Sequence, residues 1–460
     1  MSTENTCFRL LPAVFFLAAA AGLLTGTARG ETRTAAALTP QAVWEAIDAA
    51  KDGDVVQLPE GTATWKQGWN TNRWAKMKAI TIQGAGIDQT VIRDDTSTAA
   101  GDEPFEIKGV EGKPFRITGI TFDGTGLPNA GTWAGEVVIS GDCKSFRVDH
   151  CRFLNMDRMM TISGDTYGLI DHCSFDALQK KGGLAQTIYC MGPGKVNFTR
   201  PLTFGTAKAV YFEDNEAHFS PQVVEATGNN PWIVPYDGAR VVIRHNRIVN
   251  TQLEIYRVRP GALGCQSSEI YDNAFSAEGA KAGRPQGFIF ISGGVSIVFN
   301  NTVTGTSYNC HTIEISHERS FRPIGEFGIC DGTNPIDGNQ VPAGQKGAGY
   351  PAFGQPGRAT DANGDGVFEP SPCYAWNNTL NGAKLNMTLR RWDPKETALQ
   401  AEHVKEGRDF FNEEPKPDYY KPYVYPHPFQ TGWQAQISGA ADSADAVSGK
   451  APAKASDGKP

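Results

Sequence analysis

Val148-Asp149-His150-Cys151-Arg152-Phe153 is followed 22 residues later by the near copy Ile170-Asp171-His172-Cys173-Ser174-Phe175, and weaker copies continue along the chain. In each copy, apolar residues flank a short polar step that ends in Cys or Asn. This Cys or Asn recurs at Cys151, Cys173, Asn215, Asn246, Asn273, Asn301 and Asn378. A repeat of about 20–50 residues is the signature of a solenoid or another repeat architecture.

The pattern predicts an all-β fold, a right-handed parallel β-helix (β-solenoid). Each apolar flank points inward, the chain bends at the polar step, and the Cys or Asn stacks on its equivalent about 4.8 Å away in the next coil. Asn suits such a bend because it tolerates the left-handed conformation and bonds neighbouring backbone. Coils bury their apolar faces only against each other. The interval of 42 between Cys173 and Asn215 predicts two turns of about 21 residues.

The frequent glycine (51 residues) and apolar spacing nearer two than 3.6 argue against helical repeats. One solenoid domain is expected over residues 31–437, with an amphipathic helix near residues 40–51 capping its first coil. A Gly- and Pro-rich insertion is expected at about 304–372, and a C-terminal helix and loop region at about 381–437. The tail 438–460 lacks large apolar residues and is predicted to be disordered.

Residues 1–30 have the features of a secretory signal peptide, because Arg9 precedes an apolar run that ends in small residues before Glu31. The run of about 15 residues is too short to span a membrane. We therefore expect a secreted or periplasmic protein. Removal of the signal peptide leaves eight cysteines, an even number that permits disulfides in an exported chain. For Cys151 and Cys173, stacked free thiols and a disulfide remain alternatives.

The net charge of −7, from 43 basic and 50 acidic residues, makes a broad nucleic-acid-binding face improbable. Asp149-His150 and Asp171-His172 are predicted to form a ladder on adjacent coils. Two carboxylates about 5 Å apart would also suit a retaining glycosidase. A regular repeat produces such ladders without any catalytic role, so a surface ladder is the preferred interpretation.

The segment Leu169-Ile170-Asp171-His172-Cys173 resembles the Asp-His signature of pectate lyases. The run from Arg244-His245-Asn246 through Arg257-Val258-Arg259-Pro260 to Tyr271-Asp272-Asn273 is similar in order to their His-Asn strand, Arg/Pro segment and closing Asn strand. Both arginines of the Arg/Pro segment precede the proline here. The chain thus resembles the pectin-lyase-like parallel β-helix superfamily, which implies a polysaccharide lyase.

Elimination across a uronic acid requires a cation beside the carboxylate, a base, and a proton for the leaving oxygen. Arginine grips a carboxylate in two places, whereas His or Tyr suits proton transfer. The predicted catalytic residues are Arg257, Arg259, His245 and Tyr256, with the identity of the base left open among them. The predicted substrate-binding residues are Arg244, Glu254 and Tyr271. We expect a groove along the coils that carry them, partly covered by the insertion. The alternative is that Arg257 and Arg259 belong to a solvated face.

The segment from Asp361 to Glu369 follows the beginning of a calcium loop. Oxygen ligands fall at Asp361, Asn363, Asp365 and Glu369, with Gly366 at the turn. Pro372 occupies the position of the usual final acidic ligand. A calcium site that stiffens the insertion and a calcium-free turn both fit this segment.

The preferred functional hypothesis is a lyase that cleaves a uronic-acid-containing polysaccharide by β-elimination. A non-catalytic glycan-binding or cell-surface β-helix is the alternative, and a glycoside hydrolase is the third possibility. The expected partner is an acidic polysaccharide, with no nucleic acid and no membrane span, and the protein is expected to be a monomer. Fold alone does not decide among these functions.

Overall fold

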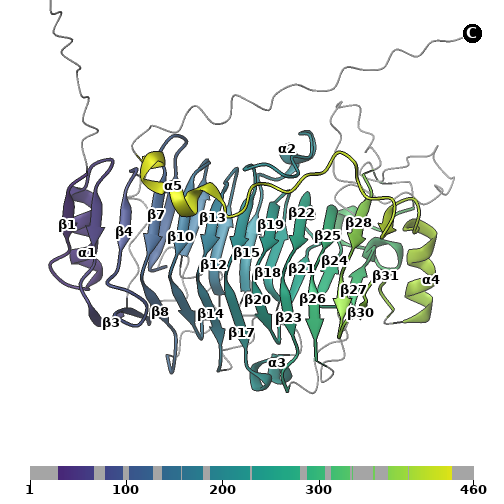
Figure 1. Cartoon of the computed structure of the whole chain (residues 1–460), viewed down its shortest axis with the longest axis horizontal. Helices are drawn as coiled ribbons and strands as arrows, with labels where there is room; N and C mark the ends of the chain where they lie inside the picture. Colours follow the sequence, from purple (N-terminus) through teal and green to yellow (C-terminus); the bar gives the residue numbers. More distant parts are fainter. Residues whose placement is uncertain are drawn as a thin grey trace, which may run out of the picture.

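The computed structural model of the chain describes residues 30–66, 78–96, 103–127, 137–156, 158–179, 187–227, 231–279, 287–305, 312–331, 334, 356–357, 371–391 and 393–437. The predicted signal peptide, apart from Gly30, the calcium loop and the tail 438–460 lie outside these residues. The described chain winds into stacked coils, each of which contributes strands to three long sheets (Figure 1).

Sheet A contains, in spatial order, β1 (Thr32–Thr34), β2 (Val55–Gln57), β4 (Thr81–Gln83), β7 (Phe115–Thr118), β10 (Phe146–Asp149), β13 (Gly168–Asp171), β16 (Val210–Glu213), β19 (Arg240–Arg244), β22 (Ser267–Tyr271), β25 (Val295–Phe299), β28 (Cys373–Trp376) and β32 (Phe410–Asn412). Sheet B contains β3 (Gly61–Trp65), β5 (Thr90–Asp94), β8 (Thr121–Asp123), β11 (Arg152–Leu154), β14 (Ser174–Ala177), β17 (Glu216–Phe219), β20 (Arg247–Val249), β23 (Ala274–Ser276), β26 (Thr302–Thr304), β29 (Thr379–Leu380) and β30 (Ala383–Lys384).

Sheet C contains β6 (Phe105–Gly109), β9 (Val137–Gly141), β12 (Arg158–Ser163), β15 (Thr187–Met191), β18 (Pro231–Tyr236), β21 (Gln252–Ile255), β24 (Ile289–Ile291), β27 (Ile313–Ile315) and β31 (Met387–Leu389). Neighbouring strands pair in parallel, apart from the antiparallel β29–β30 pair. The predicted parallel β-helix is confirmed.

A ladder of asparagines holds the bend between sheets A and B. The side chain of Asn273 donates to Asn301 Oδ1 at 2.9 Å, and its own Oδ1 accepts from Asn246 at 2.9 Å. Asn215 and Asn378 extend the ladder in both directions. The left-handed residue of each bend is the one before the ladder position, as in Asp272 with a φ of 55°. The ladder asparagines are therefore selected for backbone hydrogen bonding, and not for left-handed backbone as we expected.

The prediction that residues 173–215 form two turns is wrong. Strand β13 pairs directly with β16, and the Cys173 amide donates to Asn215 Oδ1 at 3.0 Å. A single coil therefore spans this interval. Its extra length lies in the connection that follows β15, which includes α2 (Lys195–Phe198). The ladder residues mark only the position where each coil bends between sheets A and B. The spacing between two ladder residues therefore does not show how many turns lie between them.

The insertion also begins later than expected. Strand β27 continues sheet C at residues 313–315, inside the range predicted as inserted. The extra residues therefore fall in the connection between β27 and β28, which contains the short 3-10 helices η2 (Glu318–Ser320) and η3 (Gly325–Phe327). Helix α3 (Pro221–Thr227) lies between β17 and β18 of a single coil.

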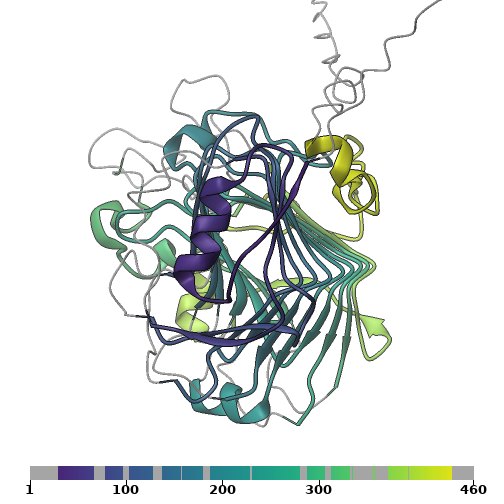
Figure 2. The same ribbon diagram turned by 90° about the vertical axis from the view of Figure 1, so that its left-hand side faces the viewer.

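Helices cover the two ends of the described solenoid. Helix α1 (Pro40–Ala49), capped by Thr39, lies across the first coil (Figure 2). It buries Val43, Trp44 and Ile47 in the solenoid core, as the amphipathic pattern predicted. At the other end, α4 (Pro394–His403) begins after the cap Asp393 and contacts η2. The two helices thus occupy the positions of the end caps that a solenoid requires.

The residues from Glu413 to Ile437, which we call the strap, run back along sheet A and end in α5 (Pro428–Ile437) over β10 and β13 (Figure 1). No repeat or motif in the sequence predicts this return path. In the described part of the chain, seven cysteines are free and buried, which settles the Cys151–Cys173 alternatives in favour of stacked thiols. No described helix has the length and apolarity needed to cross a membrane.

Candidate functional site

The predicted site residues are divided between two outer faces of the solenoid. Arg244 and Tyr271 are on sheet A, and His245 is at the adjoining bend. Glu254 is on sheet C, and Tyr256, Arg257 and Arg259 follow the same strand, β21. The expected single groove therefore does not form. The arginines of the two faces have different surroundings.

Arg244 is fully buried, and it is not available to a substrate. Its guanidinium donates to Glu213 at 2.6 Å, to the Tyr271 hydroxyl at 2.8 Å, and to the strap carbonyls of Tyr423 and Val424 at 2.7 and 2.8 Å. Tyr271 is 2% exposed in the same arrangement. Substrate-binding roles for Arg244 and Tyr271 are therefore wrong, because the strap covers both side chains.

His245 also faces the strap. Its ring stacks on Tyr425 with centroids 3.8 Å apart, and burial lowers its pKa. His245 lies at the bend that leads from sheet A to sheet B. Arg257 lies after β21, in the connection that leads from sheet C to the next strand of sheet A. His245 is consequently not part of one proton-transfer cluster with Arg257 and Arg259, contrary to the prediction.

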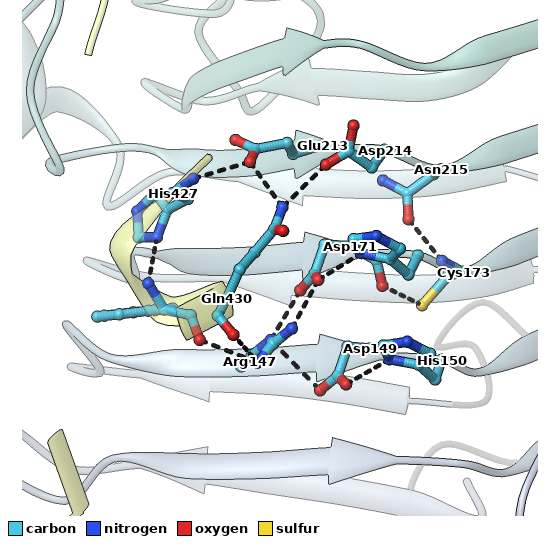
Figure 3. A network of polar contacts seen from close by, with 12 residues as sticks. Arg147, Asp149, His150, Asp171, Cys173, Glu213, Asp214, Asn215, His427 and Gln430 are labelled. Atoms are coloured by element: carbon cyan, nitrogen blue, oxygen red, sulfur yellow. Dashed lines mark hydrogen bonds and ion pairs between the residues drawn. The ribbon is translucent and has the colours of Figure 1, made fainter. Parts of the chain in front are cut away.

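The Asp-His ladder forms a structural network under the strap (Figure 3). Asp149 and Asp171 are both fully buried, and Arg147 lies between them, with its Nη2 2.8 Å from Asp171 and its Nε 3.4 Å from Asp149. Burial would raise the pKa of Asp149, but hydrogen bonds from Arg116 and His150 outweigh it and hold that pKa far below its usual value. Carboxylates neutralised in this way are unsuited to act as a glycosidase pair.

The outer face of sheet C brings together Tyr256, Arg257 and Arg259 with three aromatic or basic residues that the sequence did not reveal. Arg257 lies over the Tyr256 ring at 4.6 Å, and Arg259 lies over Tyr236 at 4.1 Å. Further along, Arg158 lies over Tyr189 at 4.1 Å. The tyrosines contact one another edge to face, with centroids 5.8 and 6.2 Å apart. We call these six residues the Arg–Tyr face.

Arg158, Tyr189 and Tyr236 lie on three successive strands of sheet C, β12, β15 and β18. Because side chains alternate along a strand, the sequence alone could have identified these Tyr and Arg side chains as outward-facing. What the sequence did not provide was the register between these strands, because no ladder residue marks sheet C.

Glu318 of η2 gathers three arginines at one end of the Arg–Tyr face. Its carboxylate lies 2.9 Å from Arg257 Nε and 3.3 Å from Arg390 Nη1, and it also pairs with Arg322. Burial lowers the pKa of Arg390 to about 10 and also lowers the pKa of Arg322. Glu314 and Glu396 also act electrostatically on Arg390, so acidic and basic groups are mixed at this end of the face.

Arg259 differs from Arg257 in that its acidic neighbour, Asp237, interacts with it electrostatically but forms no ion pair with it within the described residues. Within the described residues, no carboxylate oxygen lies within 4.0 Å of its guanidinium, and its buried Nε has no hydrogen-bond partner. Its side chain is held by the Tyr236 ring and by the short turn in which Arg259 and Ala262 exchange backbone hydrogen bonds. An unpaired, positioned guanidinium of this kind suits a carboxylate ligand.

Two carboxylates accompany these arginines on sheet C. Glu254, Phe290 and Glu314 are in register on β21, β24 and β27. The flanking residues of each strand point into the core, so these three point outward. Glu254 and Glu314 are thus two coils apart, about 9.6 Å along the sheet. Burial raises the pKa of Glu314, which favours a protonated carboxyl at a higher pH than usual.

No group of three or more His, Cys, Asp or Glu side chains suited to a metal ion occurs among the residues that the structure describes. The calcium ligands predicted from the sequence, Asp361, Asn363, Asp365 and Glu369, are outside the described residues. The calcium site therefore stays a prediction.

No protein-family model matches this sequence, and no curated protein matches it. Among solved structures, the chain is similar to the ORF18 protein of a Geobacillus virus, with 11% identity, a TM-score of 0.33 and coverage of 61% of this chain. The chain spans 58% of the length of that protein. It is also similar to a catalytic domain of GH87 alpha-1,3-glucanase in complex with tetrasaccharides, with 10% identity, a TM-score of 0.30, and coverage of 84% of this chain and 68% of that one. A second structure of that catalytic domain gives 11% identity and a TM-score of 0.26 over the same coverage. Similarities this low carry no argument about function.

Proposed function

We propose that the Arg–Tyr face binds an acidic polysaccharide and that the protein cleaves it by β-elimination. The observation that carries this proposal is Arg259, a guanidinium held at 4.1 Å over Tyr236 without an ion-paired carboxylate in the described chain. Aromatic rings provide surfaces for the apolar faces of sugars, while arginines provide paired donors for their carboxylates. Successive coils repeat this combination along the solenoid axis, as a polymer requires.

The proposed elimination removes the proton beside the uronate carboxylate and breaks the bond to the leaving sugar oxygen, forming a carbon–carbon double bond. Negative charge accumulates on the carboxylate as the proton leaves. Arg259 is assigned to this charge because a positioned donor stabilises a transition state most where charge develops. Arg257 is already paired with Glu318, so its proposed role is to orient the substrate.

Tyr256 is assigned to proton transfer. Burial raises its pKa, although Arg257 opposes this effect, so the phenol keeps its proton at neutral pH. It is therefore suited to donate a proton to the leaving oxygen, while the phenolate oxygen so formed accepts the proton removed from the carbon, which restores the phenol. Arginine remains protonated in proteins and is a poor base. This argument and the position of His245 leave Tyr256 as the proton-transfer residue of the predicted set.

A second candidate function is hydrolysis with inversion, supported by Glu254 and Glu314. Inverting glycosidases use two carboxyl groups about 6.5–9.5 Å apart, with an acid whose pKa is raised. The raised pKa of Glu314 fits the acid of this scheme, with Glu254 as the base, and the strand separation of about 9.6 Å lies just above that range.

The product distinguishes the two functions. Purified protein is incubated with a panel of acidic and neutral polysaccharides, and both the ultraviolet absorbance of unsaturated uronates and the release of reducing ends are followed. Elimination yields both signals, whereas hydrolysis yields reducing ends alone. Tyr256→Phe is expected to abolish the absorbance signal and Glu314→Gln to leave it largely intact. The reverse pattern supports hydrolysis, and binding without any cleavage supports a glycan-binding protein.

The pectate lyase-like relationship, export and a monomeric state belong with this proposal. An exported enzyme meets extracellular polysaccharides, and a single solenoid carries the whole Arg–Tyr face on its own coils. N-terminal sequencing of the protein recovered from outside the cytoplasm tests export, with Glu31 expected as the first residue.

A further inference from the structure

A pair of stacked histidines lies on the outer edge of the bend between sheets A and B, away from the Arg–Tyr face. The rings of His150 and His172 are parallel within 4°, and their centroids are 5.1 Å apart. Their side chains are 56% and 43% exposed. Both residues adopt left-handed backbone at equivalent positions of adjacent coils, with φ of 50° and 51°. The fold therefore presents two imidazoles to solvent side by side.

A buried carboxylate fixes the tautomer of each ring. His150 Nδ1 lies 2.7 Å from Asp149 Oδ2, and His172 Nδ1 lies 2.9 Å from Asp171 Oδ2. Asp149 and Asp171 also accept hydrogen bonds from Arg116 and Arg147, respectively, so an ionised carboxylate is the group that Nδ1 meets. Such a carboxylate accepts only, and Nδ1 must therefore carry the proton. In the neutral ring the lone pair is then on Nε2.

This arrangement is the one in which proteins hold metal-ligating histidines. A ligating imidazole typically donates its other N–H to a carboxylate, which orients the ring and increases the basicity of the ligating nitrogen. Here the same carboxylate contact occurs twice, on adjacent coils. In the described chain neither Nε2 has a protein partner. The two carboxylates also offset the charges of Arg116 and Arg147, so a cation does not face an uncompensated positive surface.

The rings must approach each other to share one ion. Metal–nitrogen bonds of about 2.0–2.1 Å place two nitrogens on the same side of an ion about 3.0–3.4 Å apart. Parallel rings 5.1 Å apart must therefore tilt toward each other by about 2 Å at their Nε2 edges. Exposed imidazoles on a bend tolerate such a tilt, with each Nδ1–carboxylate hydrogen bond acting as the pivot.

We propose that His150 and His172 form a transition-metal site in which their two Nε2 atoms bind one ion and water completes the coordination. Imidazole nitrogen favours Cu²⁺, Ni²⁺ and Zn²⁺, and Cu²⁺ is bound most tightly in the usual order of affinities. The site is independent of the proposed polysaccharide chemistry, because it lies at the opposite end of the sheet A strands from the connection to sheet C.

Titration of the full chain with Cu²⁺, followed by electron paramagnetic resonance, tests the proposal. We expect one equivalent whose spectrum shows two nitrogen ligands. The variants His150→Asn and His172→Asn each remove one imidazole and are expected to weaken this binding at least tenfold. Asparagine is chosen because Asn300 and Asn377 occupy the same left-handed position on later coils.

The matched control is His245→Asn, which removes an imidazole from the same bend position but from a coil where Tyr425 covers the ring. It is expected to retain the copper signal of the wild type. A wild-type spectrum without a two-nitrogen species overturns the proposal, as does a two-nitrogen species that survives in both His150→Asn and His172→Asn. Melting temperatures of the three variants establish that each is folded.

Discussion

The outer faces of sheets A and C both carry arginine and tyrosine, but their arginines differ in burial and in ion pairing. On sheet A, Arg244 is saturated by Glu213, Tyr271 and the strap carbonyls. On sheet C, Arg259 rests on a tyrosine ring without an ion-paired carboxylate in the described chain. The difference is not in the residue types but in what covers them. A buried, paired arginine serves the fold, whereas a half-buried, unpaired one is available to a ligand.

The strap accounts for this difference. Tyr420 donates to Glu269 at 2.7 Å, and Arg147 donates to the carbonyls of Phe429 and Gln430 at 2.9 and 3.4 Å. Many of these contacts use strap backbone, so they depend on where the strap lies more than on its side chains. Tyr211, Tyr271 and Phe299 form an apolar cluster beneath it. Sheet A therefore has a second, small core on its outer side.

The largest expected effect is on stability and comes from Arg244→Met. The change leaves Glu213 as a buried carboxylate without its guanidinium partner, and such losses cost about 3–5 kcal/mol. We expect a large decrease in melting temperature and in the denaturant midpoint. The double variant Arg244→Met with Glu213→Gln should recover part of the loss. An Arg244→Met protein with wild-type stability would mean that the strap does not bury this pair.

The next effect is on activity and comes from Arg259→Ala. Loss of a charge-stabilising group lowers turnover by about 10²–10³-fold. Stability should change little, because the guanidinium gives up only a ring contact worth about 0.5–1 kcal/mol. Cleavage rate and melting temperature are measured on the same preparation, with Arg259→Lys as the charge-retaining control. Undiminished cleavage by folded Arg259→Ala contradicts the assignment of Arg259 to charge stabilisation. The arginines of sheet C would then be structural, like those of sheet A.

A smaller effect concerns pH and the strap. Burial raises the pKa of Glu269 from 4.5 to about 7, although its hydrogen bond from Tyr420 acts in the opposite direction. An acid with a raised folded pKa binds its proton more tightly in the folded protein. Its contribution to stability is therefore complete below about pH 4.5 and is lost as the pH rises through about 7.

Glu269→Gln removes this titration while keeping an acceptor for Tyr420. We expect the variant to be more stable than the wild type at pH 8, by about 3 kcal/mol, with the advantage disappearing toward pH 4.5. Unfolding free energies of both proteins across this range provide the measurement. A difference that is the same at every pH would show that Glu269 does not titrate in this window.

The smallest effect is expected from Tyr425→Phe. The Tyr425 hydroxyl donates to Asp214 at 2.9 Å, and the ring itself is partly exposed. Losing this hydrogen bond costs about 0.5–1.5 kcal/mol, whereas the stacking on His245 remains. Hydrogen exchange of the strap amides should increase, while polysaccharide cleavage stays unchanged. A change in cleavage would indicate that the strap and the Arg–Tyr face are coupled.

The sequence by itself determined the coil, the apolar interior, the ladder bend and the capping helix α1. These features repeat a local pattern, and each coil needs only its immediate neighbours, so a residue such as Asn273 is predicted from the residues beside it and from Asn246 and Asn301. The same reasoning identified Arg257 and Arg259 together, because they follow one strand two residues apart.

Only the tertiary structure decided which arginines are covered and which are open. The contact between Arg147 and Phe429 joins residues 282 positions apart, and no repeat pattern connects them. The long coil between Cys173 and Asn215 was likewise misread, since a connection of any length can leave the ladder and return to it. Local periodicity specifies how coils stack, but the position of a non-repeating segment depends on surfaces that exist only after the coils have stacked.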